Sequence, residues 1–112
     1  MGTLLYDSSA SLKFDDRVLS HLQIVIGSKL RRGESFYFSW VDRPEDGSGR
    51  WALWMHPTIS LAYHYSGSSV PSINRAWLEE LVLSANTAGG LHLTHEPADI
   101  ADSARVEHLQ AH

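Results

Sequence analysis

Hydrophobic and polar residues alternate along several short segments of the chain, whereas two longer segments repeat every three or four residues. Short apolar runs at residues 4–6 and 12–14 flank a turn-forming stretch, which predicts a small hairpin. Residues 35–41, 50–55 and 59–65 follow the period of two that characterises a β-strand. Because short connections join these three segments, we expect them to form an antiparallel meander.

The segments with helical spacing carry start and stop signals. The first follows Asp15, which is positioned to cap it, and ends near Gly33, which can adopt a left-handed conformation. The second follows Asn74 as the expected N-cap and ends within residues 86–90, before a last short strand at 91–94. The apolar stripe of the first helix comprises Val18, Leu22, Val25, Ile26 and Leu30.

This order of elements, ββαβββαβ, predicts an α+β fold. We expect an antiparallel sheet of about five to six short strands with both helices packed on one face. Residues 1–96 are predicted to form a single α+β domain. Residues 97–112 are predicted to form an acidic tail that is weakly helical or disordered.

Composition narrows the possible functions. The chain has 112 residues, no cysteine and a net charge of −4, so disulfides, thiolate catalysis and cysteine-ligated zinc are excluded. It has no apolar run long enough to span a membrane, and we expect a cytoplasmic protein without membrane contacts. Residues 96–112 hold four acidic residues and one arginine, which leaves the preceding residues nearly neutral. Any binding of nucleic acid therefore has to depend on a local patch.

One local basic patch is present at the end of the first predicted helix. It consists of Lys29, Arg31 and Arg32, with Arg17 nearby. Together with an exposed aromatic ring, these cations could hold a phosphate backbone and stack bases, so a nucleic-acid accessory module is an alternative function. A simpler explanation for these basic residues is that they interact favourably with the helix dipole and keep the surface soluble.

Aromatic residues are more numerous than one thin core requires: the chain has four Trp, four Tyr and three Phe. The alternation places Tyr37, Trp54 and His64 on the strand face opposite the expected core. Aromatic side chains on this second face suggest that it is also buried, against another part of the molecule or a partner. We therefore predict a homodimer with these three residues in its interface; a hydrophobic helix surface is the alternative contact.

The histidines form the densest group of possible metal ligands. His92 and His95 point to opposite faces of a strand, and His56 and His64 could join them only if the fold brought all four together. A histidine-based, metal-dependent enzyme is thus a second alternative. We predict no metal site, no cofactor and no catalytic residue.

Several scattered motifs resemble a family of small actinobacterial proteins of unknown function, whose members often carry an automatic label of ATP-dependent DNA ligase. The resemblance covers residues 1–96. It rests on residues 1–6 (MGTLLY), 14–17 (FDDR), 21–22 (HL), 29–36 (KLRRGESF) and 38–40 (FSW), on Trp54 with His56 and Pro57, on Asn74 with Trp77, on Ala85 with Asn86, and on Gly90 with Leu91.

The ligase label can be tested against the chain itself. Ligases of that class use a lysine in a Lys-x-Asp-Gly motif, and the nearest string here, residues 13–16 (KFDD), lacks the glycine. A chain of this length also cannot house both a nucleotide pocket and a DNA clamp. We expect no autonomous ligase activity and predict a small soluble domain that acts by binding.

Overall fold

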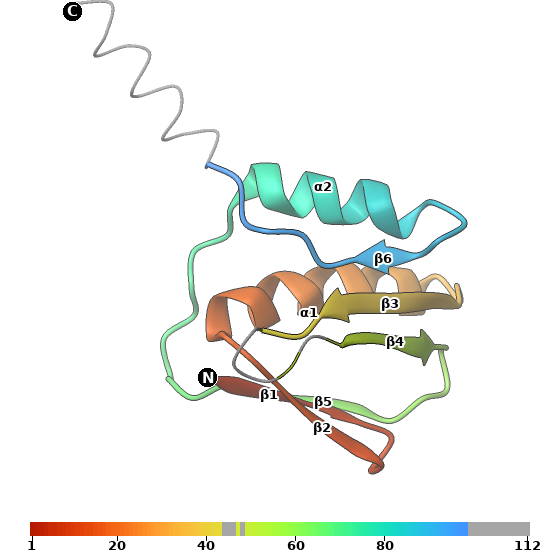
Figure 1. Ribbon diagram of the computed structural model, residues 1–112, viewed down its shortest axis with the longest axis horizontal. Coiled ribbons are helices and arrows are strands. Elements are labelled where there is room, and N and C mark those ends of the chain that lie inside the picture. The colour runs from red at the N-terminus through yellow and green to blue at the C-terminus, as the bar shows by residue number, and fades with distance from the viewer. Residues whose placement is uncertain (44–46, 48, 99–112) are drawn as a thin grey trace, which may run out of the picture.

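The computed structural model describes residues 1–43, 47 and 49–98. The α+β class and the predicted order of elements are confirmed (Figure 1). Residues 99–112 of the predicted tail lie outside the described part. The elements are β1 (Gly2–Tyr6), β2 (Ala10–Phe14), α1 (Asp16–Arg31), β3 (Phe36–Val41), β4 (Arg50–Met55), β5 (Leu61–His64), α2 (Arg75–Ala85) and β6 (Leu91–His92).

The described strands form two three-stranded sheets instead of one. Sheet A has the order β2-β1-β5 and sheet B the order β4-β3-β6. The predicted meander of β3, β4 and β5 is therefore wrong, because β5 leaves β4 and pairs antiparallel with β1. A period of two shows that a segment is a strand but does not identify its partner. The Asp7 amide, which donates to the Ser60 carbonyl at 2.8 Å, helps to lead β5 to sheet A.

The last strand also departs from a purely antiparallel sheet. β6 runs parallel to β3, since the chain returns through α2 before it reaches the sheet again. Gly90 makes this approach possible: its φ is +86°, and a Cβ there would overlap the Tyr37 carbonyl. Glycine is the residue that tolerates both conditions.

Of the start and stop signals predicted for α1, the stop signal at Gly33 acts as expected and the Asp15 cap does so only in part. Gly33 has a φ of +77°, and the amides of Gly33 and Glu34 donate to the carbonyls of Leu30 and Lys29 at 3.0 and 3.1 Å. This closes the helix as predicted. At the other end, Asp15 is the N-cap residue but its side chain makes no capping hydrogen bond.

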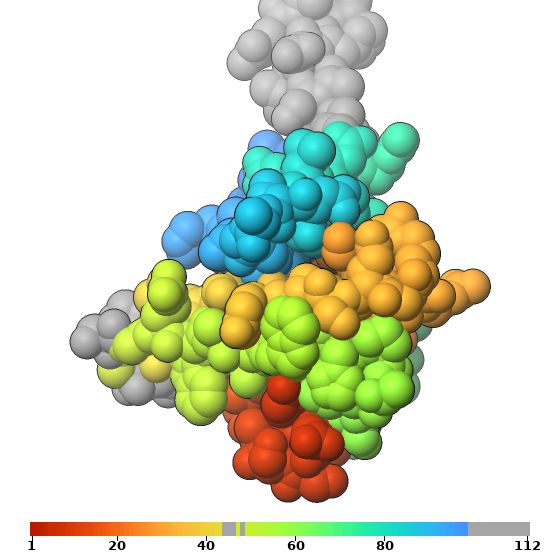
Figure 2. Space-filling model, turned by 90° about the vertical axis from the view of Figure 1, so that its right-hand side faces the viewer, coloured from red at the N-terminus to blue at the C-terminus, as the bar shows by residue number. Residues whose placement is uncertain are grey.

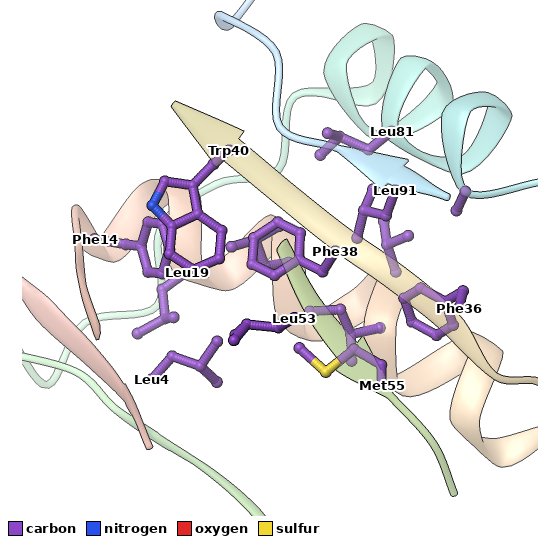
Figure 3. Close-up of a cluster of buried hydrophobic side chains, with 14 of the residues drawn as sticks. Leu4, Phe14, Leu19, Phe36, Phe38, Trp40, Leu53, Met55, Leu81 and Leu91 are labelled. Carbon is purple, nitrogen blue, oxygen red and sulfur yellow. The ribbon is translucent and has the colours of Figure 1, made fainter. Parts of the chain in front are cut away.

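The hydrophobic core lies between the two sheets and the two helices. Figure 3 shows Phe38 of β3 at its centre, with Leu4 of β1, Leu19 of α1 and Leu81 of α2 pointing toward the same cluster. These four side chains are fully buried. The two sheets are also tied directly, because the Tyr6 hydroxyl donates to the backbone carbonyl of Trp54 at 2.5 Å.

Candidate functional site

A groove of about 880 Å³ runs along the outer face of α1. Figure 2 shows the carboxyl-terminal half of α1, in orange, between α2 (cyan) and the region of β5 (green). Its size is within the range of small-molecule sites, which is roughly 300–1,000 Å³. The helix contributes Ser20, Gln23, Ile24, Gly27, Ser28 and Arg31, followed by Arg32. The opposite wall consists of Tyr65, residues 67–71 and Ile73.

The helical spacing of α1 explains why this face is open. Its apolar stripe turns Leu22, Val25 and Ile26 into the core, which leaves Gln23 and Ile24 outside. Ile24 is consequently 42% exposed, although its side chain is apolar. Gly27 widens the groove, because no atom lies within 4 Å of the place where a Cβ would stand. A glycine inside a helix costs about 0.5–1 kcal/mol relative to alanine.

The opposite wall is held in place by the first turn of α1. The Asp16 carboxylate accepts hydrogen bonds from the Ser66 and Gly67 amides, at 3.1 and 3.0 Å, and from the Ser66 hydroxyl at 3.0 Å. The two backbone hydrogen bonds are the main reason why the pKa of Asp16 is lowered. Within the lining, the Tyr65 hydroxyl donates to Gln23 Oε1 at 2.5 Å. The walls are therefore joined at two points.

Charge is distributed unevenly along the groove. Arg31 and Arg32 lie at the carboxyl end of α1, and no acidic residue is among the described residues that line the groove. Glu34, outside the lining, accepts from Arg32 Nε at 3.1 Å. Because the helix-end carbonyls of Lys29 and Leu30 already accept backbone amides, the side chains dominate the charge at this end.

A polar cluster joins α1 to the segments that flank α2 and β6. Arg17 donates to both oxygens of Glu96, and its Nη1 donates to the Ser72 carbonyl at 2.7 Å. Asn74 Nδ2 donates to Glu96 Oε2 at 2.9 Å and to the Pro97 carbonyl at 2.8 Å. The pKa of Glu96 is lowered to about 2, chiefly by the hydrogen bonds from Arg17, while partial desolvation opposes the change.

His21 is fully buried in this cluster, as is Asn74, and our sequence predictions missed it. The Asn74 amide donates to His21 Nε2 at 2.9 Å, so Nε2 is the acceptor and Nδ1 carries the proton toward the Arg17 carbonyl, at 2.7 Å. His21 is a neutral ring that links two segments. Its position between Val18 and Val25, at helical spacing on the inner side of α1, was the available signal.

The four cations predicted to bind nucleic acid do not form one patch. Arg17 and Lys29 are about 18 Å apart along the axis of α1. Arg17 is bonded to Glu96, and Lys29 is buried and donates to Asn86 Oδ1 at 3.0 Å. Arg31 and Arg32 are the two that the structure brings together at the groove.

The predicted interface residues are divided between the two sheets. Tyr37 and Trp54 face each other across β3 and β4 with ring centroids 4.9 Å apart, and they are 51% and 46% exposed. His64 lies on β5 of sheet A, opposite Thr3. Tyr37 and Trp54 therefore form an exposed aromatic pair on the side of sheet B that faces away from the core, without His64.

The described histidines do not converge. His56 Nδ1 is 3.0 Å from the Thr58 hydroxyl, whereas His64 and His92 lie on different sheets. Over residues 1–43, 47 and 49–98, no three His, Asp or Glu side chains are grouped so that they could hold a metal ion. Neither helix in the same ranges is long and apolar enough to cross a membrane.

Comparison with known proteins gives a family but no function. Searches of curated proteins and of solved structures found no protein similar to this chain. Residues 1–96 match a family described as a domain of unknown function, DUF7882, and this range includes both the groove and the Arg17–Glu96 pair. The chain therefore belongs to the DUF7882 family.

Proposed function

We propose that this domain binds an elongated, largely apolar ligand in the groove along α1. The observation that carries the proposal is an apolar lining held open between fixed walls: Ile24 on α1 faces a wall that contains Val70, Pro71 and Ile73. Val70 is 87% exposed and Ile24 42%. Covering apolar surface of this kind contributes about 25 cal/mol per Å² of buried area, which is the driving force for binding.

The polar lining supports binding in preference to catalysis. Four serines line the groove, but a serine nucleophile needs a general base within hydrogen-bonding reach. No histidine or carboxylate is among the described lining residues that could serve as that base. Ser20 donates its hydroxyl to the Asp16 carbonyl at 2.9 Å, and the other three serines supply hydroxyl groups that orient a bound molecule.

The proposal can be tested with the uncharged, polarity-sensitive dye Nile red. We expect its emission to shift to the blue and to increase on addition of the full-length protein. Ser28→Trp places an indole in the groove and should weaken dye binding at least roughly tenfold, about 1.4 kcal/mol. Ser60→Trp adds the same indole to an exposed position outside the groove and should leave binding unchanged. Unchanged dye binding by Ser28→Trp, or none by the unmodified protein, would refute the proposal.

Self-association through the outer face of sheet B is a second candidate function. Tyr37 and Trp54 carry it, with exposed Val41 and Ala52 on the same face. This face has no acidic residue among its described strand positions, so two copies can meet with little like-charge repulsion other than between their Arg50 side chains. A symmetric dimer uses one patch twice, which suits such a surface.

Sedimentation velocity over a range of concentrations tests this second candidate. We expect a dimer that the double variant Tyr37→Ser, Trp54→Ser converts to a monomer. Leu83→Ser removes an exposed apolar side chain from α2 instead and should remain dimeric. A monomeric unmodified protein at all concentrations contradicts the proposal.

Several other predictions from the sequence do not enter this proposal. Nucleic-acid binding, a cytoplasmic location, an actinobacterial origin and the ligase label of relatives stay predictions. Two of the four proposed nucleic-acid contacts, Arg17 and Lys29, already bond within the chain, so we do not base the function on them.

A further inference from the structure

We infer that the ligand of the α1 groove is an amphipathic anion, with one apolar chain and a carboxylate or phosphate head group held by Arg31 and Arg32. This inference rests on the proposed function and adds the charge and orientation of the ligand. The groove is polarised along α1, since Ser20 lies near its first turn and both arginines lie at its carboxyl end. A ligand with one charged end fits that arrangement in a single direction.

The two arginines have donors to offer. Arg31 is exposed, and the structure describes no hydrogen bond or ion pair for it within residues 1–43, 47 and 49–98. The Arg32 side chain is 57% exposed and uses its Nε for Glu34, which leaves its terminal nitrogens available. Guanidinium groups bind carboxylates and phosphates through paired hydrogen bonds.

The backbone at this end does not cancel the attraction. Carbonyl groups at the end of a helix repel anions, but those of Lys29 and Leu30 accept the amides of Glu34 and Gly33. Lys29 adds a third cation, and Glu34 is the one carboxylate among residues 29–34. The net charge of this short segment is therefore positive.

The remaining length of the groove suits the apolar chain. From Ser20 to Arg31 the helix axis covers about 16 Å. Ile24 and Gly27 lie between these ends, and Val70 and Ile73 stand on the opposite wall. A groove of about 880 Å³ with two walls matches a single free chain better than the surface of a bilayer.

Displacement of Nile red by three ligands of equal chain length tests the inference. Dodecanoate and dodecyl phosphate carry the charge, whereas dodecanol lacks it, and all are used as monomers below the concentration at which they aggregate. We expect both anions to bind at least roughly tenfold more tightly than dodecanol, a difference typical of charge-assisted hydrogen bonds. The double variant Arg31→Gln, Arg32→Gln should lose that preference and keep its affinity for Nile red.

A matched control removes the same charge elsewhere. Arg50→Gln, Arg75→Gln changes two exposed arginines outside the groove and should retain the preference for the anions. Equal binding of dodecanol and dodecanoate, or a preference that survives Arg31→Gln, Arg32→Gln, would overturn the inference. If Nile red still binds and Ser28→Trp still blocks it, the proposed function stands without the charged head group.

Two further outcomes separate this ligand from other partners. Sedimentation of the protein with anionic phospholipid vesicles, without binding of monomeric dodecanoate, would identify a membrane surface and overturn the inference. Displacement of the dye by an acidic peptide but by neither amphiphile would identify a peptide site and would also overturn it. Absence of Nile red binding by the unmodified protein would instead refute the proposed function itself.

Discussion

Arg17 and Glu96 form a two-pronged ion pair although 79 residues separate them in the chain. Arg17 Nε lies 2.8 Å from Glu96 Oε1, and Arg17 Nη2 lies 2.6 Å from Glu96 Oε2. The pair holds the segment after β6 against the first turn of α1, and Asn74 joins it from the N-cap of α2. Three segments that are distant in sequence therefore meet at one carboxylate.

The first prediction concerns the pH dependence of this pair. The pKa of Glu96 falls from 4.5 to about 2 in the folded protein, so its contribution to stability is complete above pH 4.5 and is lost as the pH falls toward 2. Because the pair is partly exposed, we expect Glu96→Gln to lower the free energy of unfolding by on the order of 1 kcal/mol at neutral pH. Urea unfolding at neutral pH and near pH 2 measures the difference. Glu79→Gln on α2 is the control, and a Glu96→Gln effect of equal size at both pH values would contradict this account.

The second prediction concerns the buried ring of His21. His21→Leu keeps most of the side-chain volume but leaves the buried Asn74 amide without its acceptor and removes the hydrogen bond from Nδ1 to the Arg17 carbonyl. An unsatisfied buried polar group costs about 1–3 kcal/mol, and we expect a loss of that size in urea unfolding. His56→Leu, at a partly exposed position, should change stability by less than about 0.5 kcal/mol. Equal effects of the two substitutions would show that His21 has no such linking role.

The third prediction separates stability from binding at Gly27. Gly27→Ala should raise the free energy of unfolding by about 0.5–1 kcal/mol, because alanine favours the helix and its Cβ meets open space. The same methyl group narrows the groove, so we expect weaker binding of Nile red. Thermal unfolding and dye titration of one sample give both values. A variant that is more stable and binds the dye more tightly would contradict the assignment of the groove.

The fourth prediction is the opposite effect at Gly90. Its φ of +86° and the nearby Tyr37 carbonyl leave no room for a side chain. We expect Gly90→Ala to destabilise the protein by more than about 1 kcal/mol, through strain at the approach of β6 to β3. Chemical unfolding measures the free energy of unfolding of Gly90→Ala and of Gly27→Ala under the same conditions. An unchanged free energy of unfolding for Gly90→Ala would show that β6 can shift without cost.

Much of the candidate site could be predicted only in pieces. Arg31 and Arg32 belong to the basic patch that the sequence predicts, whereas Ile24 lies outside the apolar stripe that the spacing predicts for α1. Their relation to Val70 and Ile73 depends on a wall that Asp16 fixes through the backbone of residues 66 and 67. No sequence spacing reports that contact, because it joins residues 50 positions apart.

The sequence by itself determined the features that depend on neighbouring residues. The period of α1, the Asn74 cap that accepts the Trp77 amide, the left-handed Gly33 and the exposure of Tyr37 beside buried Phe38 all follow from local geometry. Tertiary structure decided which strand β5 joins, which carboxylate Arg17 holds and where the groove lies. These choices depend on how much apolar surface the whole chain buries and on how many hydrogen bonds it satisfies. A short window of residues does not contain this information.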